Sequence, residues 1–210
     1  MRAVGEFPHH FDHPSDISEM MKLLRYKHED TYHHCVRVAL LSEKAASAMR
    51  LDPASAQKLV RGCFIHDLGK LLVPNAILDS VKPLTEEQWS LIKRHPEYGA
   101  DILRDKGERD AELIRLVLHH HERWDGKGYP YGLAGEQIPL FARICSVVDA
   151  FDTMMSPRPY RRRKTLEEAT EELLRNAGTQ FDSAIVNAFI PLAGEVTPLY
   201  FSIYDRDKRP

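Results

Sequence analysis

The sequence predicts an all-α fold built around one hydrophobic core. Apolar residues recur three and four positions apart in segment after segment, which is the spacing of one helix face. Helix-capping residues precede several of these segments, and no stretch of useful length alternates like a strand or repeats internally. With 210 residues and 43% hydrophobic content, the chain is long enough for one domain with short terminal extensions.

Three helices are predicted in the first third of the chain. Ser15 or Asp16 offers an N-cap for a short amphipathic helix, and a second helix is predicted over residues 29–49. Asp52 and Pro53 have the residue types that begin a helix, so a third one follows. Its apolar run ends at a His-Asp pair with a glycine behind it, which predicts a helix end at this pair.

The middle of the chain predicts a loop and another helix. Residues 71–84 read as a loop with one short turn, and Thr85 begins a capping sequence. The helix after it is predicted to reach His95, where the restriction before Pro96 suggests a break.

A helix that ends in three histidines follows, and after it a turn-rich, glycine-containing loop. The segment 139–155 is again helical, with one apolar face. Thr165 and Asp182 are predicted N-caps of two packing helices. The elements are therefore helices throughout.

The composition excludes several classes of protein. A net charge of −2 argues against a protein that coats long nucleic acid, although a small anionic ligand stays open. No run approaches the roughly 20 apolar residues of a membrane span, and the first residues lack the core of a signal peptide, so we expect no membrane insertion and a cytoplasmic location. The three cysteines are widely spaced, which favours reduced thiols in the core over a disulfide framework.

The stretch 118–130, LHHHERWDGKGYP, concentrates imidazole, carboxylate and turn residues. Neighbouring helical side chains point in different directions, so all three histidines cannot face one ion. An adjacent pair can reach two neighbouring ions, and the third would be exposed or behind them. The alternative is a surface histidine tract, but this run lies within an amphipathic pattern at mid-chain.

Two more stretches carry candidate ligands. Asp30, His34 and Arg37 share one stripe of the second predicted helix, although such a set is more often a solvated surface than a metal site. His66 and Asp67 end an apolar run, where burying them is costly unless a metal or hydrogen bonds satisfy them.

Further charged residues are candidates for the same site, and two of these features have an alternative explanation. Lys70 can hold a phosphate oxygen beside metal-bound carboxylates, or it can be a helix-end lysine opposite the helix dipole. The acids Asp149 and Asp152 lie inside an apolar helix and need partners. The basic stretch SPRPYRRRK suits a phosphate-bearing ligand, and otherwise it is a solvated turn.

Read in order, these motifs are HxxR from residue 34, HDLGK from residue 66, RHP from residue 94, HHERWDGKGYP from residue 120 and VVDAFD from residue 147. The chain resembles the HD-GYP family, a branch of the HD phosphohydrolases, from about residue 29 to 193. The resemblance implies an HD-domain helical bundle with the GYP loop and extra C-terminal helices. It divides the chain into an N-terminal extension with one short helix (1–28), an HD-GYP domain (29–193) and a tail (194–210).

The resemblance implies hydrolysis of cyclic di-GMP to 5′-pGpG, and in some members on to GMP, at two or three divalent ions. The implied metal ligands are His34, His66, Asp67, His95, His120, His121 and Asp149, with His119 left over. Trinuclear members have a glutamate four residues before the first histidine, where this chain has the shorter Asp30, so the number of ions stays open. Asp67 would bridge two ions.

The implied substrate contacts are Lys70, Arg158 and Arg161 for phosphates, together with the intact GYP motif, Gly128, Tyr129 and Pro130. The implied metal is iron or manganese, and zinc, nickel or magnesium can occupy such a site in purified protein. Imidazole and carboxylate donors agree with this choice. A hydroxide between paired ions would attack phosphorus, so Asp67 and Lys70 are the catalytic candidates and no protein nucleophile is needed.

Two alternatives to the enzyme stay open, namely a catalytically silent cyclic-dinucleotide receptor and an HD hydrolase of another nucleotide. About 28 residues precede the matched region and about 17 follow it, so we expect no attached sensor domain. Control would then come from metal loading, expression or a protein partner in trans. The apolar tail makes a homodimer a further expectation.

Overall fold

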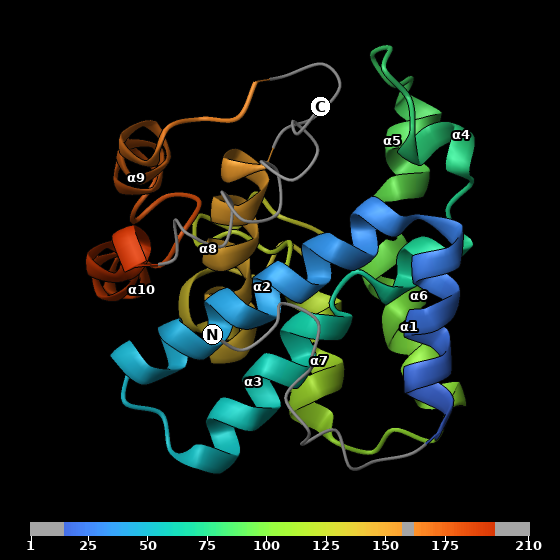
Figure 1. The fold of residues 1–210 in the computed structure, drawn as a ribbon, viewed down its shortest axis with the longest axis horizontal. Helices are drawn as coiled ribbons and strands as arrows, with labels where there is room; N and C mark the ends of the chain where they lie inside the picture. Colours follow the sequence, from blue (N-terminus) through green and yellow to red (C-terminus); the bar gives the residue numbers. More distant parts are fainter. Residues whose placement is uncertain (1–14, 157–161, 196–210) are drawn as a thin grey trace, which may run out of the picture.

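The computed structural model describes residues 15–156 and 162–195, and these form helices connected by loops (Figure 1). The described part contains no strand, only two isolated bridges, so the all-α prediction is confirmed. The α-helices are α1 (Ser15–Lys27), α2 (Glu29–Ala48), α3 (Pro53–Ile65), α4 (Asn75–Leu78), α5 (Glu86–Ile92), α6 (His95–Asp105), α7 (Ala111–His119), α8 (Leu140–Met155), α9 (Leu166–Arg175) and α10 (Ser183–Phe189). Short 3-10 helices are η1 (Leu68–Leu72), η2 (Gly135–Gln137) and η3 (Ile190–Leu192).

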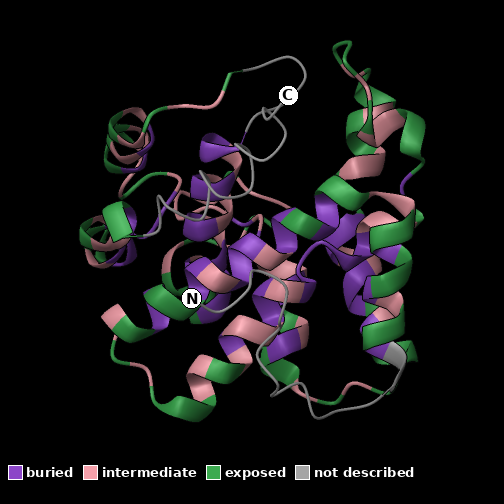
Figure 2. Ribbon diagram, viewed as in Figure 1, coloured by how far each residue is buried: buried purple, intermediate pink, exposed green. Residues whose placement is uncertain are grey.

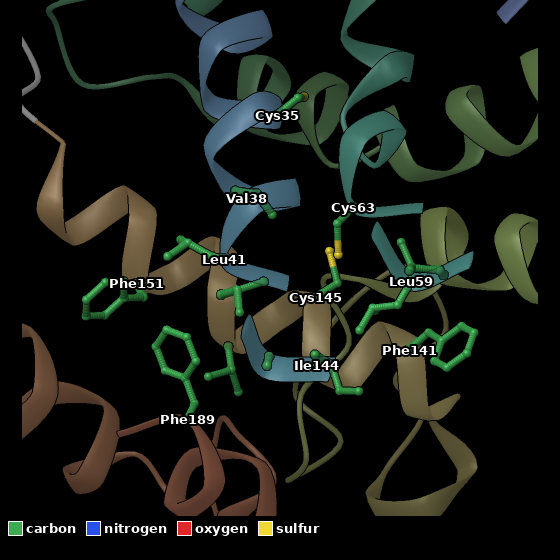
Figure 3. Packing of buried hydrophobic residues seen from close by; sticks show 14 of the residues in the cluster. Cys35, Val38, Leu41, Leu59, Cys63, Phe141, Ile144, Cys145, Phe151 and Phe189 are labelled. Atoms are coloured by element: carbon green, nitrogen blue, oxygen red, sulfur yellow. The ribbon is translucent and has the colours of Figure 1, made fainter. Parts of the chain in front are cut away.

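Helix α2 is the centre of the core. It packs against α1, α3, α8 and α10, and Figure 2 shows buried residues concentrated along α2 and α8. Val38 and Leu41 of α2 are completely buried and belong to the same hydrophobic cluster as Phe151 of α8 and Phe189 of α10 (Figure 3). Because helix α2 is apolar on this side, burial of the stripe fixes its rotation and decides which residues face the other way.

A second contact, between η1 and α6, depends on glycine. A Cβ on Gly69 would collide with the carbonyl oxygen of His95, and it would lie 2.5 Å from the backbone nitrogen of Gly99. Only glycine therefore allows the backbone that follows α3 to touch the first turn of α6. This close approach brings the C-terminal end of α3 next to His95.

Several predicted helix starts are confirmed by their caps. Thr85 forms a capping box with Gln88, and Thr165 forms one with Glu168. The side chain of Asp182 accepts a hydrogen bond from the backbone N–H of Ala184, which begins α10. Each bond satisfies an N–H that has no partner within its own helix.

The prediction of one helix running to His95 is wrong. Helix α5 ends at Ile92, and α6 begins at His95 with Pro96 in its first turn. Proline is well suited to the first turn of a helix because no N–H is required there and its φ is already helical. Pro96 therefore marks a helix start, and His95 belongs to the helix after the break.

Cys35, Cys63 and Cys145 are buried and free, as predicted. In the ranges 15–156 and 162–195, no helix is both long and apolar enough to span a bilayer. The arginines Arg158 and Arg161 and the tail expected to mediate a homodimer lie outside the described residues. The cytoplasmic location, the domain boundaries and a protein partner stay predictions.

Candidate metal centre

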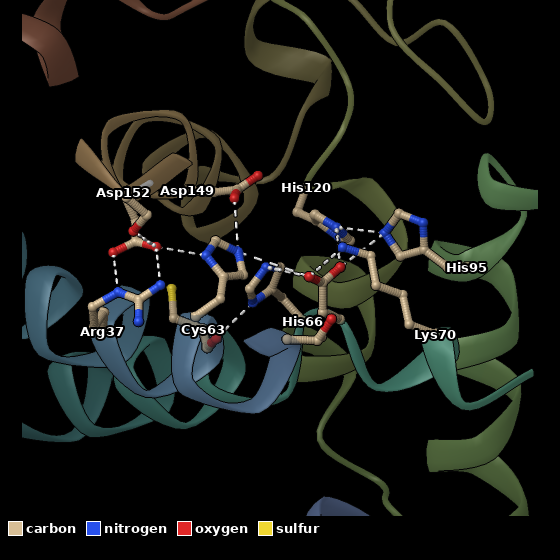
Figure 4. A network of polar contacts seen from close by, with 12 residues as sticks. Arg37, Cys63, His66, Lys70, His95, His120, Asp149 and Asp152 are labelled. Atoms are coloured by element: carbon tan, nitrogen blue, oxygen red, sulfur yellow. Dashed lines mark hydrogen bonds and ion pairs between the residues drawn. The ribbon is translucent and has the colours of Figure 1, made fainter. Parts of the chain in front are cut away.

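Candidate ligands from distant parts of the chain converge on one site (Figure 4). His34 lies on α2, His66 and Asp67 follow the last residue of α3, and His95 opens α6. His120 and His121 follow α7, and Asp149 lies on α8. The sequence-predicted set of these seven residues is therefore brought together, mostly at helix ends.

The ligand atoms form two groups with Asp67 between them. One group is Asp67, His95, His120 and His121, and the other is His34, His66 and Asp149; within each, the ligand atoms lie within 4.8 Å of one another. Oδ1 of Asp67 lies 3.2 Å from Nε2 of His95 and 4.0 Å from Nε2 of His120. Its Oδ2 lies 3.5 Å from Nε2 of His66 and 3.7 Å from Nε2 of His34. The two oxygens thus face different groups.

Three of the histidines are oriented by hydrogen bonds at Nδ1, the ring nitrogen on the side away from Nε2. Nδ1 of His66, His95 and His120 each donates to a backbone carbonyl three residues earlier, and each of these bonds is 2.7 Å long. A carbonyl can only accept, so Nδ1 carries the proton and Nε2 presents a lone pair. This is the tautomer that metal-binding histidines use.

His34 is held by carboxylates instead. Its Nδ1 lies 2.7 Å from Oδ2 of Asp152, and Arg37 binds the same carboxylate through two nitrogens at 2.8 and 3.0 Å. Its Nε2 lies 3.0 Å from Oδ1 of Asp149. Burial alone would lower the pKa of His34, but the hydrogen bonds to Asp149 and Asp152 outweigh burial and raise the pKa to about 9. A proton therefore occupies the position between His34 and Asp149 that a cation can take.

The remaining ionisable groups have the charge states that metal ligands need. Burial and the charge of His95 lower the pKa of His121 to about 3, and burial also lowers the pKa of His66 and His120. Burial alone would raise the pKa of Asp67, but the charges of Lys70 and the neighbouring imidazole outweigh it and hold the pKa well below its usual range. At neutral pH the imidazoles of His66, His120 and His121 are therefore neutral beside the ionised carboxylate of Asp67, and His34 keeps its proton until a cation replaces it.

The residues fit metal ions because buried polar atoms here have no other partner. Nε2 of His66 and Oδ1 of Asp67 are buried without a hydrogen bond. Nε2 of His95 and Nε2 of His120, each with a lone pair, face one another at 3.1 Å. Leaving such groups unpaired costs free energy, and a cation among them would remove the cost. Nitrogen and oxygen donors of this kind suit iron, manganese or zinc.

Lys70 and the GYP loop border the two groups. Nζ of Lys70 lies 2.6 Å from Oδ2 of Asp67, so the lysine neutralises the central carboxylate. The ring of Tyr129 lies over that of His121, with centroids 4.8 Å apart, and the Tyr129–Pro130 peptide bond is cis. A Cβ on Gly128 would collide with the backbone around Glu122, so this glycine lets the loop approach the histidines.

Asp30 and His119 lie apart from these groups. Asp30 is exposed in the first turn of α2 and belongs to neither group. His119, which the resemblance leaves over, is partly buried with its ring 5.7 Å from that of Tyr131, and it belongs to neither group. Cys35, expected to be a simple core residue, also lies near ligand atoms of His66 and Asp67, but burial raises the pKa of its thiol.

Sequence reasoning missed the roles of three residues. Asp152 was recognised as an acid that needs a partner, but nothing in its spacing pointed to His34. Arg37 read as part of a polar stripe, although it is buried against Asp152. Glu122 is buried directly after the histidines, and only its place within the motif could have suggested a role.

Comparisons with known proteins agree with this geometry. The family model described as an HD domain matches residues 18–185. A cyclic di-GMP phosphodiesterase of Thermotoga maritima is 34% identical over 203 residues, which cover 96% of this chain and 55% of that protein. The 3′3′-cGAMP-specific phosphodiesterase 2 of Vibrio cholerae is 31% identical, over 90% of this chain and 38% of that protein.

A solved structure supports the same assignment. An HDG"Y"P protein from Bdellovibrio bacteriovorus aligns with a TM-score of 0.65 and 25% identity, covering 78% of this chain and 52% of that chain. The chain spans about half, or less, of the length of the curated relatives described here. Because the family model covers most of the sequence, and a relative above 30% identity extends over nearly all of it, the chain belongs to the HD domain family.

Proposed function

We propose that this chain is a metal-dependent phosphodiesterase that hydrolyses cyclic di-GMP. The observation that carries the proposal is the placement of Asp67, whose two oxygens face separate groups of buried ligands. A carboxylate in this position is suited to bridge a pair of ions. The name of the T. maritima relative supports the choice of reaction and substrate.

The two groups around Asp67 would each hold one ion. Iron or manganese is the proposed metal, and zinc, nickel or magnesium can replace it in purified protein. When bound, such a pair activates water and neutralises charge on the phosphodiester. We favour two ions over three because the candidate for a third, Asp30, is exposed and outside both groups.

The chain's own residues would orient the substrate. Lys70 has a side chain that is 22% exposed at the edge of the site, so it can reach a phosphate oxygen while it stays close to Asp67. Burial raises the pKa of Tyr129, so its phenol stays protonated and can donate a hydrogen bond. Arg158 and Arg161 stay proposed phosphate contacts from the sequence alone.

The proposed reaction opens the cyclic dinucleotide ring. Water adds to one phosphorus atom and the bond from phosphorus to the 3′ oxygen breaks. The products of this step are a 5′-phosphate and a 3′-hydroxyl on the linear dinucleotide 5′-pGpG. A second hydrolysis of the same kind would release GMP.

A second candidate substrate is 3′3′-cGAMP. The V. cholerae relative is named for this cyclic dinucleotide, and its similarity extends over 90% of this chain. A cyclic-dinucleotide receptor without turnover would keep the same ligand groups, so it is the alternative from another class.

A substrate panel tests the proposal. Anaerobically purified protein loaded with iron or manganese is incubated with cyclic di-GMP, 3′3′-cGAMP and a linear dinucleotide, and the products are separated. We expect 5′-pGpG from cyclic di-GMP and none from Asp67→Asn. Tight binding without any product would support the receptor, and faster cleavage of 3′3′-cGAMP would reassign the substrate.

A further inference from the structure

Glu122 is a buried acid, and within the described part of the chain the hydrogen-bond partners of its carboxylate are backbone groups of the loop. The residue is 2% exposed. Its Oε1 accepts the backbone N–H of Tyr131 at 2.8 Å, and its Oε2 accepts that of Leu133 at 3.1 Å. Among the described residues, the basic group within 4.0 Å of this carboxylate is Nδ1 of His119, at 3.9 Å. This nitrogen has no hydrogen-bond partner among the described residues, so it does not hold the carboxylate.

These two bonds come from the segment that directly follows the GYP motif. A carboxylate removed from water is costly unless its oxygens are bonded, and bonds from N–H groups to a charged acceptor are strong. Glu122 and this segment therefore stabilise each other. If the segment moved away, two buried oxygens would lose their donors.

The loop is also attached at its base. The backbone N–H of Asp125 donates to the carbonyl of Thr179 at 2.8 Å, and that of Gly135 donates to the carbonyl of Trp124 at 2.9 Å. These bonds close the loop at residues 124–135 but leave its tip to be fixed by other contacts.

At the tip, Tyr129 is held from the histidine side. Its backbone N–H donates to the carbonyl of His121 at 3.2 Å, and its ring lies over the His121 ring. Glu122 then fixes residues 131–133 immediately after it. The loop is thus held on both sides of Pro130 by two consecutive residues. His121, a candidate metal ligand, binds Tyr129, and Glu122 binds Tyr131 and Leu133.

We propose that Glu122 is a positioning residue that holds Tyr129 and Pro130 against the metal centre, where the cyclic dinucleotide binds. The identity of the substrate in this inference rests on the proposed function. The role of Glu122 in holding the loop does not, because it follows from the hydrogen bonds. Glu122 belongs to neither group of candidate ligands, and its two oxygens accept hydrogen bonds from the loop. Its loss should weaken substrate binding more than metal binding.

Two substitutions give a graded test. Glu122→Gln has nearly the same volume but one acceptor oxygen, and its amide group would confront the second loop N–H, so one bond is lost. Glu122→Ala loses both. The matched control is Glu112→Gln, an exposed acid on α7 that pairs with Lys58 at 2.8 Å.

The first readout is amide hydrogen exchange at Tyr131 and Leu133, which does not depend on activity. In the wild-type protein both amides should be protected, and Glu122→Gln should raise exchange at one of them about tenfold. Unprotected amides in the wild type would overturn the proposal even if both variants failed to fold. Unchanged exchange in a folded Glu122→Gln would overturn it as well.

The second readout separates binding from chemistry. We expect the KM for cyclic di-GMP to rise about tenfold in Glu122→Gln, with a smaller change in kcat and unchanged metal content. Loss of metal in proportion to activity would overturn a role through the loop. If the wild-type protein hydrolysed no cyclic dinucleotide, the proposed function would fail, while the exchange data would still decide whether Glu122 holds the loop.

Discussion

Asp152 acts on the candidate site through His34. Its carboxylate fixes the proton on Nδ1 of His34, and Arg37 holds the carboxylate in place. Replacing Asp152 with asparagine removes the charge that holds this tautomer. We expect metal affinity to fall by about 10–100-fold, as is typical when a partner of a metal-bound histidine is lost. Equilibrium dialysis with manganese measures this, with Asp101→Asn, an exposed acid on α6, as the control.

An unchanged affinity in Asp152→Asn would contradict this role. It would mean that packing alone orients His34. In that case Arg37→Met should also leave metal binding intact, which offers a second test.

The same carboxylate predicts a pH dependence of stability. Burial alone would raise the pKa of Asp152, but the hydrogen bond to His34 and the charges of His34 and Arg37 lower it to about 2. A folded pKa below the unfolded value, about 3.9, stabilises the fold above pH 4, and this contribution is lost as pH falls through 2. It amounts to about 2 kcal/mol. Urea unfolding of metal-free protein at pH 5 and pH 2.5 should show a steeper loss in wild type than in Asp152→Asn.

Asp30 tests the number of ions. Because it is exposed in the first turn of α2, we expect Asp30→Ala to keep the metal stoichiometry and turnover of the wild type. Its stability should fall by at most about 1 kcal/mol, the value of an acid near a helix N-terminus. Elemental analysis beside a rate measurement decides the matter, and loss of one equivalent of metal would make Asp30 a ligand.

At the residue scale, the sequence predicted the ligands better than their supports. Imidazole and carboxylate residues at motif spacing are visible in a single chain, so His66 and Asp67 could be named as candidate ligands before the fold was known. Asp152 and His34 are 118 positions apart, and no local pattern relates residues that only the packing of α2 on α8 brings together. Glu122 was missed for a different reason, because its partners are backbone N–H groups, which no residue type reveals.

At the element scale, the end of α1 is fastened to η1. Nζ of Lys27 donates to the carbonyls of Leu71 and Val73, both at 2.6 Å. Lys27→Met keeps much of the side chain's length but leaves both carbonyls without this donor. We expect a loss of about 1–3 kcal/mol in the free energy of unfolding, measured in urea. Lys22→Met, an exposed lysine on the same helix, is the control and should change stability little.

Activity distinguishes a local from a general effect of this change. Because η1 carries Lys70, a loosened η1 should lower turnover at temperatures where the variant is still folded. Full turnover with reduced stability would mean that the bonds of Lys27 support the fold but not the site.

Element boundaries followed from local chemistry at Thr85 and Thr165, where side-chain caps are present, and failed at His95. Thr85 and Thr165 are capping residues, and the helices begin after them as predicted. The break before His95 has no side-chain cap, so the sequence showed only Pro96, which can either end a helix or begin one. In the structure Pro96 lies in the first turn of α6 and so begins a helix.

At the scale of the whole molecule, metal should stabilise the fold. The candidate ligands come from α2, α6, α8 and the ends of α3 and α7, so one bound ion connects several elements. A ligand that binds only the folded state raises the midpoint of thermal unfolding, and removing it with a chelator should lower the midpoint by several degrees. Adding manganese back should restore it. An identical midpoint with and without metal would contradict occupancy of this site.

The fold class was predictable because helical periodicity is a local property that persists along the whole chain. The packing of the helices was less predictable from the sequence. Helix α1 lies before the predicted domain start at residue 29, yet it packs against α2 and η1. Contacts between elements depend on side-chain shape, as at Gly69, and periodicity does not report shape.

The three short bonds from histidine Nδ1 to backbone carbonyls have one more consequence. The acceptors, Cys63, Ile92 and Val117, lie in the last turns of α3, α5 and α7, where carbonyls lack partners within the helix. Each imidazole therefore caps the C-terminus of a helix with Nδ1 and presents Nε2 to the two groups of candidate ligands. The bond that caps the helix end also orients the imidazole. If the helix end frayed, the histidine would no longer point its Nε2 toward the candidate site.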